Sequence, residues 1–126
     1  MAARILIVDD EPGLADVLRD LLESEGYETQ VCHDAVSARE KLAAGKFDAA
    51  MLDVFLSNEP LGLDLANHIF AEHPGTGVIM MTGYADRADI DSACLNGAFT
   101  CIDKPFFLDD VLNAIEMALD SAKVTE

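Results

Sequence analysis

Basic residues are scarce in this chain of 126 residues, which has 8 lysines and arginines against 24 aspartates and glutamates and a formal charge of −16. Such a negative charge repels phosphate backbones, so we expect no direct binding of nucleic acid. The chain also lacks an apolar run of the roughly 20 residues that cross a bilayer. Its first residues lack the long apolar region of a signal peptide. We therefore expect neither membrane insertion nor a secretory leader.

Cysteine is also rare, and Cys32, Cys94 and Cys101 are odd in number and have no metal-site spacing. This usage favours a reducing cytoplasm, with the thiols acting as small buried apolar groups. No stretch rich in proline, glycine and serine divides the chain, and its length suits one domain with its own core. Hydrophobic residues make up 51% and charged residues 25%, which excludes a disordered acidic tail.

Short apolar runs alternate with stretches of helical periodicity. The run 4–8 is almost entirely β-branched or leucine, which is typical of a strand buried on both faces. After it, leucines and one valine recur every three or four residues, as on one face of a helix. The pattern predicts strands at 4–8, 28–32, 48–53, 77–82 and 99–103, and helices at 14–22, 35–44, 63–72, 86–95 and 111–122.

Alternating strands and helices imply a parallel sheet with right-handed crossovers and helices on both faces. Five such units predict a flavodoxin-like (βα)5 domain, with strand order 2-1-3-4-5 in a three-layer αβα arrangement. In sheets of this kind, ligands bind beyond the carboxyl ends of the strands, where the strand order reverses. The residues at those ends are therefore the first candidates for a site.

Charged and hydroxyl side chains stand at four of these ends. Asp9 and Asp10 end the first strand, Asp53 the third and Thr82 the fourth, and Lys104 follows the fifth. Three carboxylates in one place repel one another unless a cation lies among them, and Mg²⁺ suits a site of few carboxylates and several waters. A metal, an ammonium and a hydroxyl beside a carboxylate would neutralise a phosphoryl group in transfer. Aspartate can accept such a group as a nucleophile.

Four short motifs carry a resemblance that covers essentially all 126 residues. They are residues 8–11, 51–54, 81–84 and 103–106, each at the end of a predicted strand. With these motifs the chain resembles the receiver domain of two-component response regulators. The resemblance implies one receiver domain over 1–126, acting as a regulatory switch and not as an enzyme.

The resemblance also implies roles for individual residues. Asp53 would be the phosphoacceptor, Thr82 the switch hydroxyl, and Lys104 the partner of the phosphoryl group. Of the acidic pair, Asp10 would be the more direct metal ligand. The implied Mg²⁺ ligands are the carboxylates of Asp9, Asp10 and Asp53 and the backbone carbonyl of Phe55.

The same resemblance implies partners. A sensor histidine kinase or a histidine phosphotransfer protein would donate the phosphoryl group, and a small donor such as acetyl phosphate could replace it. The output would be altered binding of an unidentified downstream protein, with homodimerisation as a further option. We expect His33, His68 and His73 to be surface residues away from the strand ends, so the phosphodonor histidine would belong to another protein.

The chain departs from the family pattern at two places. Cys101 stands where many receivers have an aromatic residue three positions before the lysine, and Phe99 is the nearest aromatic. After Asp53, the glycine expected at the eighth position is Gly62 at the ninth, which indicates one extra loop residue. The resemblance also marks two positions that influence hydrolysis of the acyl phosphate, two residues after Asp53 and two after Thr82. They hold the bulky Phe55 and Tyr84 here, which predicts slow hydrolysis.

Other functions stay open. The departures allow an interaction module that works without phosphorylation. An aspartyl-phosphate phosphatase of the haloacid dehalogenase type would need an aspartate two residues after its nucleophile, where Asp53 is followed by Phe55 and Asp9 by Glu11. A flavodoxin would need a neutral loop of hydroxyl residues and glycine after the first strand. The acidic residues there would repel a flavin phosphate.

Overall fold

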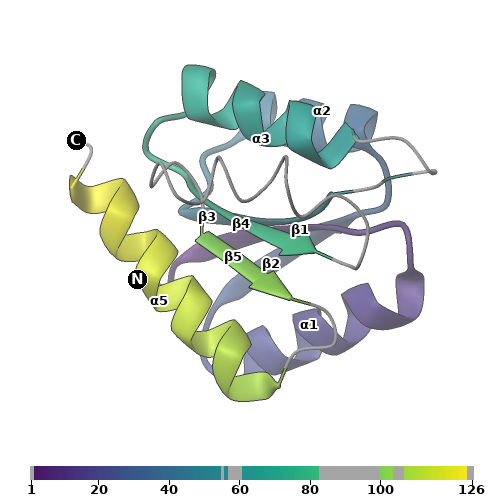
Figure 1. Cartoon of the computed structure of the whole chain (residues 1–126), viewed down its shortest axis with the longest axis vertical. Coiled ribbons are helices and arrows are strands. Elements are labelled where there is room, and N and C mark those ends of the chain that lie inside the picture. Colours follow the sequence, from purple (N-terminus) through teal and green to yellow (C-terminus); the bar gives the residue numbers. More distant parts are fainter. Residues whose placement is uncertain (1, 55, 57–60, 83–99, 104–106, 125–126) are drawn as a thin grey trace.

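The computed structural model describes residues 2–54, 56, 61–82, 100–103 and 107–124. Within these residues, five strands form one parallel sheet in the order β2-β1-β3-β4-β5, which confirms the predicted order (Figure 1). The strands are β1 Arg4–Val8, β2 Glu28–Cys32, β3 Ala49–Asp53, β4 Gly77–Thr82 and β5 Thr100–Asp103. The described helices are α1 Pro12–Ser24, α2 Ala35–Ala44, α3 Leu61–Glu72 and α5 Leu108–Val124.

Most predicted bounds agree with these elements to within a residue, and the larger differences lie at helix ends. The helices α3 and α5 begin two and three residues before the predicted starts at 63 and 111. Apolar periodicity marks only the buried face, and the first turn of α5 is acidic, with Asp109 and Asp110. Carboxylates at that end favour a helix through its dipole but carry no apolar signal. The helix predicted at 86–95 lies outside the described residues.

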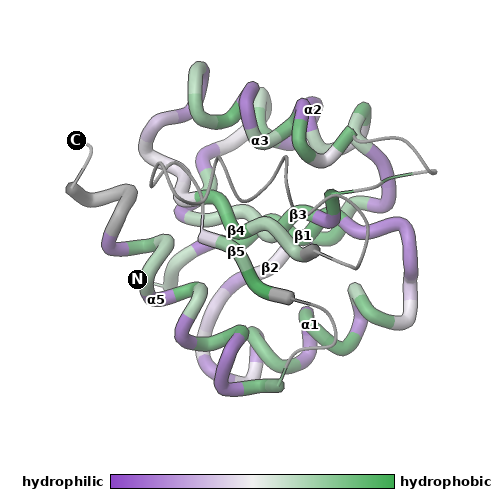
Figure 2. The backbone as a smooth tube through the Cα atoms, viewed as in Figure 1, coloured by the Kyte–Doolittle hydropathy of each residue, from purple (hydrophilic) through white to green (hydrophobic). Residues whose placement is uncertain are grey.

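Of the described helices, α2 and α3 cover one face of the sheet, and α1 and α5 cover the other (Figure 1). Because successive strand residues point to opposite faces, one set of strand side chains packs with α2 and α3 and the other with α1 and α5. Figure 2 shows the hydrophobic colour concentrated on the strands and on the inner sides of the helices. The α2–α3 face buries Leu6, Val8, Ala50, Leu52 and Met80, and the α1–α5 face buries Ile5, Ile7, Met51, Ile79 and Met81.

The central strands β1 and β3 are buried on both faces, as their apolar runs predict. Ile5 to Val8 and Ala49 to Leu52 have no exposed surface. Burying each large side chain contributes about 1.5–3 kcal/mol, so these strands are firmly held. Their register places Val8 opposite Leu52. The residues that follow, Asp9 and Asp53, therefore leave the sheet side by side.

The described part of the chain has no helix that is long and apolar enough to span a lipid bilayer.

Candidate functional site

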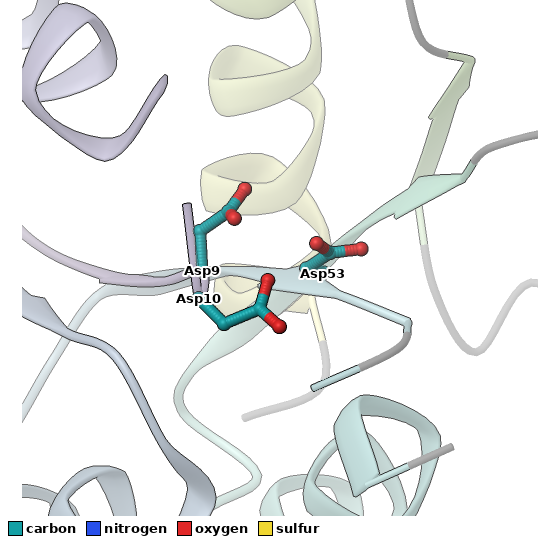
Figure 3. Close-up of side chains that lie close together, drawn as sticks. All are labelled: Asp9, Asp10 and Asp53. Atoms are coloured by element: carbon teal, nitrogen blue, oxygen red, sulfur yellow. The ribbon is translucent and has the colours of Figure 1, made fainter. Parts of the chain in front are cut away.

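Three carboxylates meet where β1 and β3 end. Asp9 and Asp10 follow β1, Asp53 is the last residue of β3, and one ligand oxygen from each lies within 4.8 Å of the others (Figure 3). Asp9 is fully buried, Asp53 is 9% exposed and Asp10 is exposed. We call these three residues the acid pocket. The strand order reverses between β1 and β3, so the acid pocket lies at the predicted edge of the sheet.

The backbone around β1 fixes Asp9 from both sides. Its N–H donates to the Cys32 carbonyl at 3.1 Å, and its Oδ1 accepts the N–H of Glu11 at 2.8 Å. Glu11 is the N-cap of α1 and makes no side-chain capping bond of its own. The Asp9 carboxylate thus holds the turn into α1 while facing the acid pocket. Asp10, by contrast, is exposed.

The backbone of Asp53 lies directly against α3. The N–H of Gly62 donates to the Val54 carbonyl at 3.0 Å, and the N–H of Val54 donates to the Met81 carbonyl at 3.3 Å. A Cβ atom on Gly62 would lie 1.7 Å from the Asp53 carbonyl oxygen, well inside any real contact. Only glycine therefore fits at this position. The shifted glycine of the sequence is thus a packing partner of Asp53, a role that spacing alone did not reveal.

The donor set fits a hard divalent cation. Mg²⁺ binds oxygen at about 2.0–2.1 Å in an octahedron, so opposite ligands lie about 4.2 Å apart. Oxygens within 4.8 Å of one another reach this spacing by small side-chain rotations. Three anionic groups this close also repel one another, and a bound dication removes that cost. The acid pocket can therefore hold a metal ion of this kind.

The other predicted site residues are described only in part. Thr82 is the last residue of β4, and its neighbour Met81 pairs with Asp53. Thr82 also pairs with Asp103 of β5, which directly precedes Lys104 in the sequence. The side chain of Thr82 and all of Lys104 and Phe55 lie outside the described residues, as do Phe99 and Tyr84.

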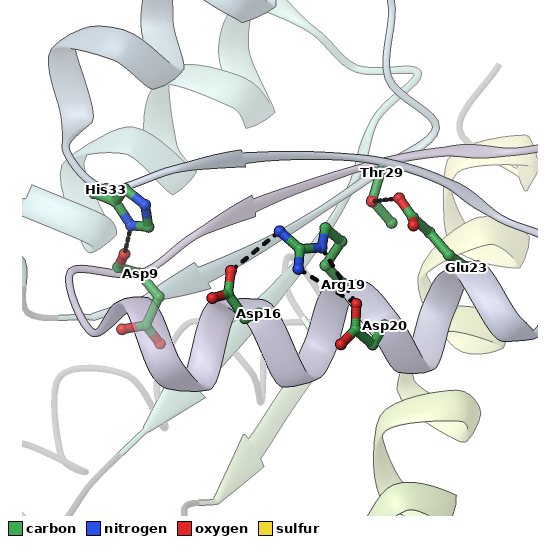
Figure 4. Close-up of polar contacts among 7 residues, drawn as sticks. All are labelled: Asp9, Asp16, Arg19, Asp20, Glu23, Thr29 and His33. Atoms are coloured by element: carbon green, nitrogen blue, oxygen red, sulfur yellow. Dashed lines mark hydrogen bonds and ion pairs between the residues drawn. The ribbon is translucent and has the colours of Figure 1, made fainter.

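His33 is next to the acid pocket, and the expectation that it lies away from the strand ends is wrong. Its Nδ1 is 2.9 Å from the carbonyl oxygen of Asp9 (Figure 4). His33 belongs to no apolar pattern in the sequence. It directly follows β2, however, as Asp9 directly follows β1, and these two strands pair in parallel. The ends of two paired parallel strands therefore predict that His33 lies beside Asp9.

The other two histidines lie away from the strand ends as predicted, but they are half-buried, whereas His33 is exposed as expected of a surface residue. His68 lies in α3 and His73 just after it, toward the amino end of β4 and thus away from the acid pocket. Both are half-buried, and their rings meet edge to face with centroids 5.5 Å apart. This contact accounts for their partial burial.

The cysteines only partly follow the prediction of buried free thiols. Cys32 is buried at the end of β2, and burial raises the pKa of its thiol, which makes it a poor nucleophile. Cys101 is half-buried in β5, beside Met80 of β4, and is disulfide-bonded. The partner in that bond lies outside the described residues.

The fold and the acid pocket together define a flavodoxin-like α/β domain with an acidic cluster at its topological switch point. The sequence pattern of the response regulator receiver domain matches residues 5–116. The chain therefore belongs to the receiver domain family of two-component response regulators, as its motifs predicted. Receiver domains are regulatory modules of phosphorylation-based signal transduction.

Relatives and solved structures agree with this family. The nitrogen assimilation regulatory protein NtrX of Azorhizobium caulinodans is 36% identical over 98% of this chain, which spans 28% of that protein. The crystal structure of NtrX from Brucella abortus has a TM-score of 0.86 at 36% identity, again over 98% of this chain and 28% of that one. A CheY-like receiver domain protein from Methanospirillum hungatei has a TM-score of 0.88 at 32% identity, with both chains covered fully.

Proposed function

We propose that this domain is a phosphoacceptor switch that receives a phosphoryl group on Asp53 from a histidine kinase or a histidine phosphotransfer protein. The observation that carries the proposal is the meeting of three carboxylates at the ends of two fully buried strands. A stabilising role does not account for it, since like charges this close cost free energy. The cluster and the family together support the proposal of a metal-assisted site of phosphoryl transfer.

The chemistry follows from the chain's own residues. A carboxylate oxygen of Asp53 attacks the phosphorus of a phosphohistidine, a P–O bond forms, and the P–N bond breaks. The electron pair of that bond stays on the imidazole nitrogen, which takes a proton from solvent. When bound, Mg²⁺ supplies positive charge that offsets the charge of the phosphoryl oxygens. In this proposal Lys104 and the Thr82 hydroxyl bind the same oxygens after transfer.

The metal would be held by the carboxylates of Asp10 and Asp53 and by the backbone carbonyl of Phe55. Asp9 has one oxygen bonded to the α1 turn, which supports a contribution through its negative charge and through ordered water. The near-complete burial of Asp9 and Asp53 strengthens their pull on a cation, because a low local dielectric screens charge poorly.

The output in this proposal is altered binding of a downstream protein. The phosphoryl group draws Thr82 and Lys104 toward it and biases a two-state equilibrium at the β4–β5 edge of the sheet. The chain spans about a quarter of the NtrX relatives it matches, so most of the length of those proteins lies beyond the region it covers. We propose a cytoplasmic location and leave a homodimer as one form of the output.

Intact mass spectrometry tests the phosphoacceptor directly. Purified protein is incubated with acetyl phosphate, once with Mg²⁺ and once with EDTA. We expect the wild type to gain one phosphoryl group only with Mg²⁺, and Asp53→Asn to gain none. The matched control is Asp16→Asn, because Asp16 lies exposed on α1, and this variant should be labelled like the wild type. An unlabelled wild type would favour the interaction module that works without phosphorylation, and equal labelling of Asp53→Asn would move the acceptor elsewhere.

A further inference from the structure

The ring of His33 makes a hydrogen bond to the peptide group that joins two members of the acid pocket. Its Nδ1 lies 2.9 Å from the carbonyl oxygen of Asp9. A carbonyl oxygen can only accept, so Nδ1 carries the proton and donates. The side chain is exposed, and the contact sits at the rim where β2 and β1 end.

This bond takes the place of one that a regular sheet would supply. In a parallel pair, a residue donates its N–H to a carbonyl on the adjacent strand. Its own carbonyl then accepts from the N–H of the residue two positions further along that same adjacent strand. Asp9 donates to Cys32, so its regular donor would be the N–H of Asp34. At Asp34 the chain turns into α2, where the Asp34 carboxylate caps the helix by accepting from the N–H of Ser37. The His33 ring supplies the donor at the point where the ladder ends.

The consequence reaches the carboxylates. The carbonyl of Asp9 and the N–H of Asp10 belong to one rigid peptide plane. A hydrogen bond that fixes this plane restricts ψ of Asp9 and φ of Asp10. These two angles set the relative orientation of the two side chains. We propose that His33 is a positioning residue of the acid pocket, which raises the affinity for a divalent cation by holding the Asp9–Asp10 peptide in place. The proposal rests on the metal site of the proposed function.

The expected effect is modest, because the His33 side chain is exposed and its bond is a single contact at the rim of the acid pocket. A hydrogen bond of this kind contributes a factor of roughly 2 to 10 in an equilibrium constant. Removing it should therefore weaken binding of Mg²⁺ by that factor. Loss of one carboxylate of the acid pocket should weaken it more.

Isothermal titration calorimetry with MgCl₂ tests the proposal on two uncharged variants that differ in the donor. His33→Phe keeps a ring and removes the donor, and should bind Mg²⁺ roughly 2- to 10-fold more weakly than the wild type. His33→Asn should bind within about 2-fold of the wild type, because its amide nitrogen can occupy the position of Nδ1. Circular dichroism first confirms that each variant is folded.

A matched control removes a similar bond at the opposite end of the strands. The buried Thr76 hydroxyl donates to the Phe47 carbonyl at 2.6 Å, before β4 and β3 begin. Thr76→Val should lower the melting temperature and leave the Mg²⁺ affinity unchanged.

Each outcome decides between the claims. Unchanged affinity in His33→Phe would overturn the positioning role and leave the phosphoacceptor in place. Equal weakening of His33→Asn, or of Thr76→Val, would also overturn it, since the donor would then not be the cause. A wild type that binds no Mg²⁺ would overturn this inference together with the metal site on which it rests.

Discussion

Gly62 offers the sharpest test of how the fold positions the phosphoacceptor. In Gly62→Ala the new Cβ would lie 1.7 Å from the Asp53 carbonyl oxygen and 2.8 Å from that of Val54. Both obstacles are backbone, so either α3 or the end of β3 must move by about 1 Å or more. Overpacking of this kind costs about 1–3 kcal/mol of the free energy of unfolding. A reacting group misplaced by about 1 Å can lose on the order of 100-fold in rate.

The assay separates the two effects with a second glycine. A Cβ on Gly77 would lie 2.1 Å from the Ala118 carbonyl oxygen, a similar backbone clash, but at the start of β4 and against α5. Urea unfolding measures the stability of both alanine variants, and intact mass follows their phosphorylation by acetyl phosphate at saturating Mg²⁺. We expect comparable losses of stability, with a rate lower by about 10- to 100-fold in Gly62→Ala alone. Equal rates in the two variants would refute the reasoning.

Three further predictions concern charge and access. Asp10→Asn should raise the melting temperature in EDTA, because it removes one of three repelling carboxylates, and should abolish the added stability that Mg²⁺ gives the wild type; thermal melts with and without metal check both effects. Hydrogen bonds from Ser37 lower the pKa of Asp34 below its ordinary value of 3.8, so its stabilising effect is present above that pH and is lost as the pH falls through the lowered value. The difference in unfolding free energy between wild type and Asp34→Asn should therefore shrink as the pH falls below 3.8, as acid titrations of urea unfolding would show, and a constant difference would contradict it. Phe55→Asn should speed the decay of phosphorylated protein, which mass spectrometry over time measures, and an unchanged rate would refute shielding by the ring.

The strands and their order could be predicted because strands buried on both faces are uninterrupted apolar runs in the sequence. Residues 5–8 and 49–52 are apolar without interruption, and the structure buries them on both faces. Parallel strands end together, so the sequence alone predicts that Asp9 and Asp53 lie side by side. The start of α5 is harder to predict, because its first turn carries the acidic Asp109 and Asp110 and gives no apolar signal.

The roles of His33 and Gly62 could not be predicted in the same way. Each contacts the backbone of a residue in another element or loop, His33 that of Asp9 and Gly62 that of Asp53. Such contacts depend on where β2 ends beside β1 and on how closely α3 approaches β3. Neither the relative position of these strand ends nor the distance between α3 and β3 produces a periodic pattern in the sequence.

The central claim is that Asp10 and the phosphoacceptor Asp53 together hold one divalent cation. Crystals grown with MnCl₂, measured near the manganese absorption edge, show the ion directly in the anomalous difference map. The account predicts one peak bonded to oxygens of both Asp10 and Asp53, with Asp9 close by. A peak elsewhere, or an Asp53 carboxylate turned away from Asp9 and Asp10, would contradict it.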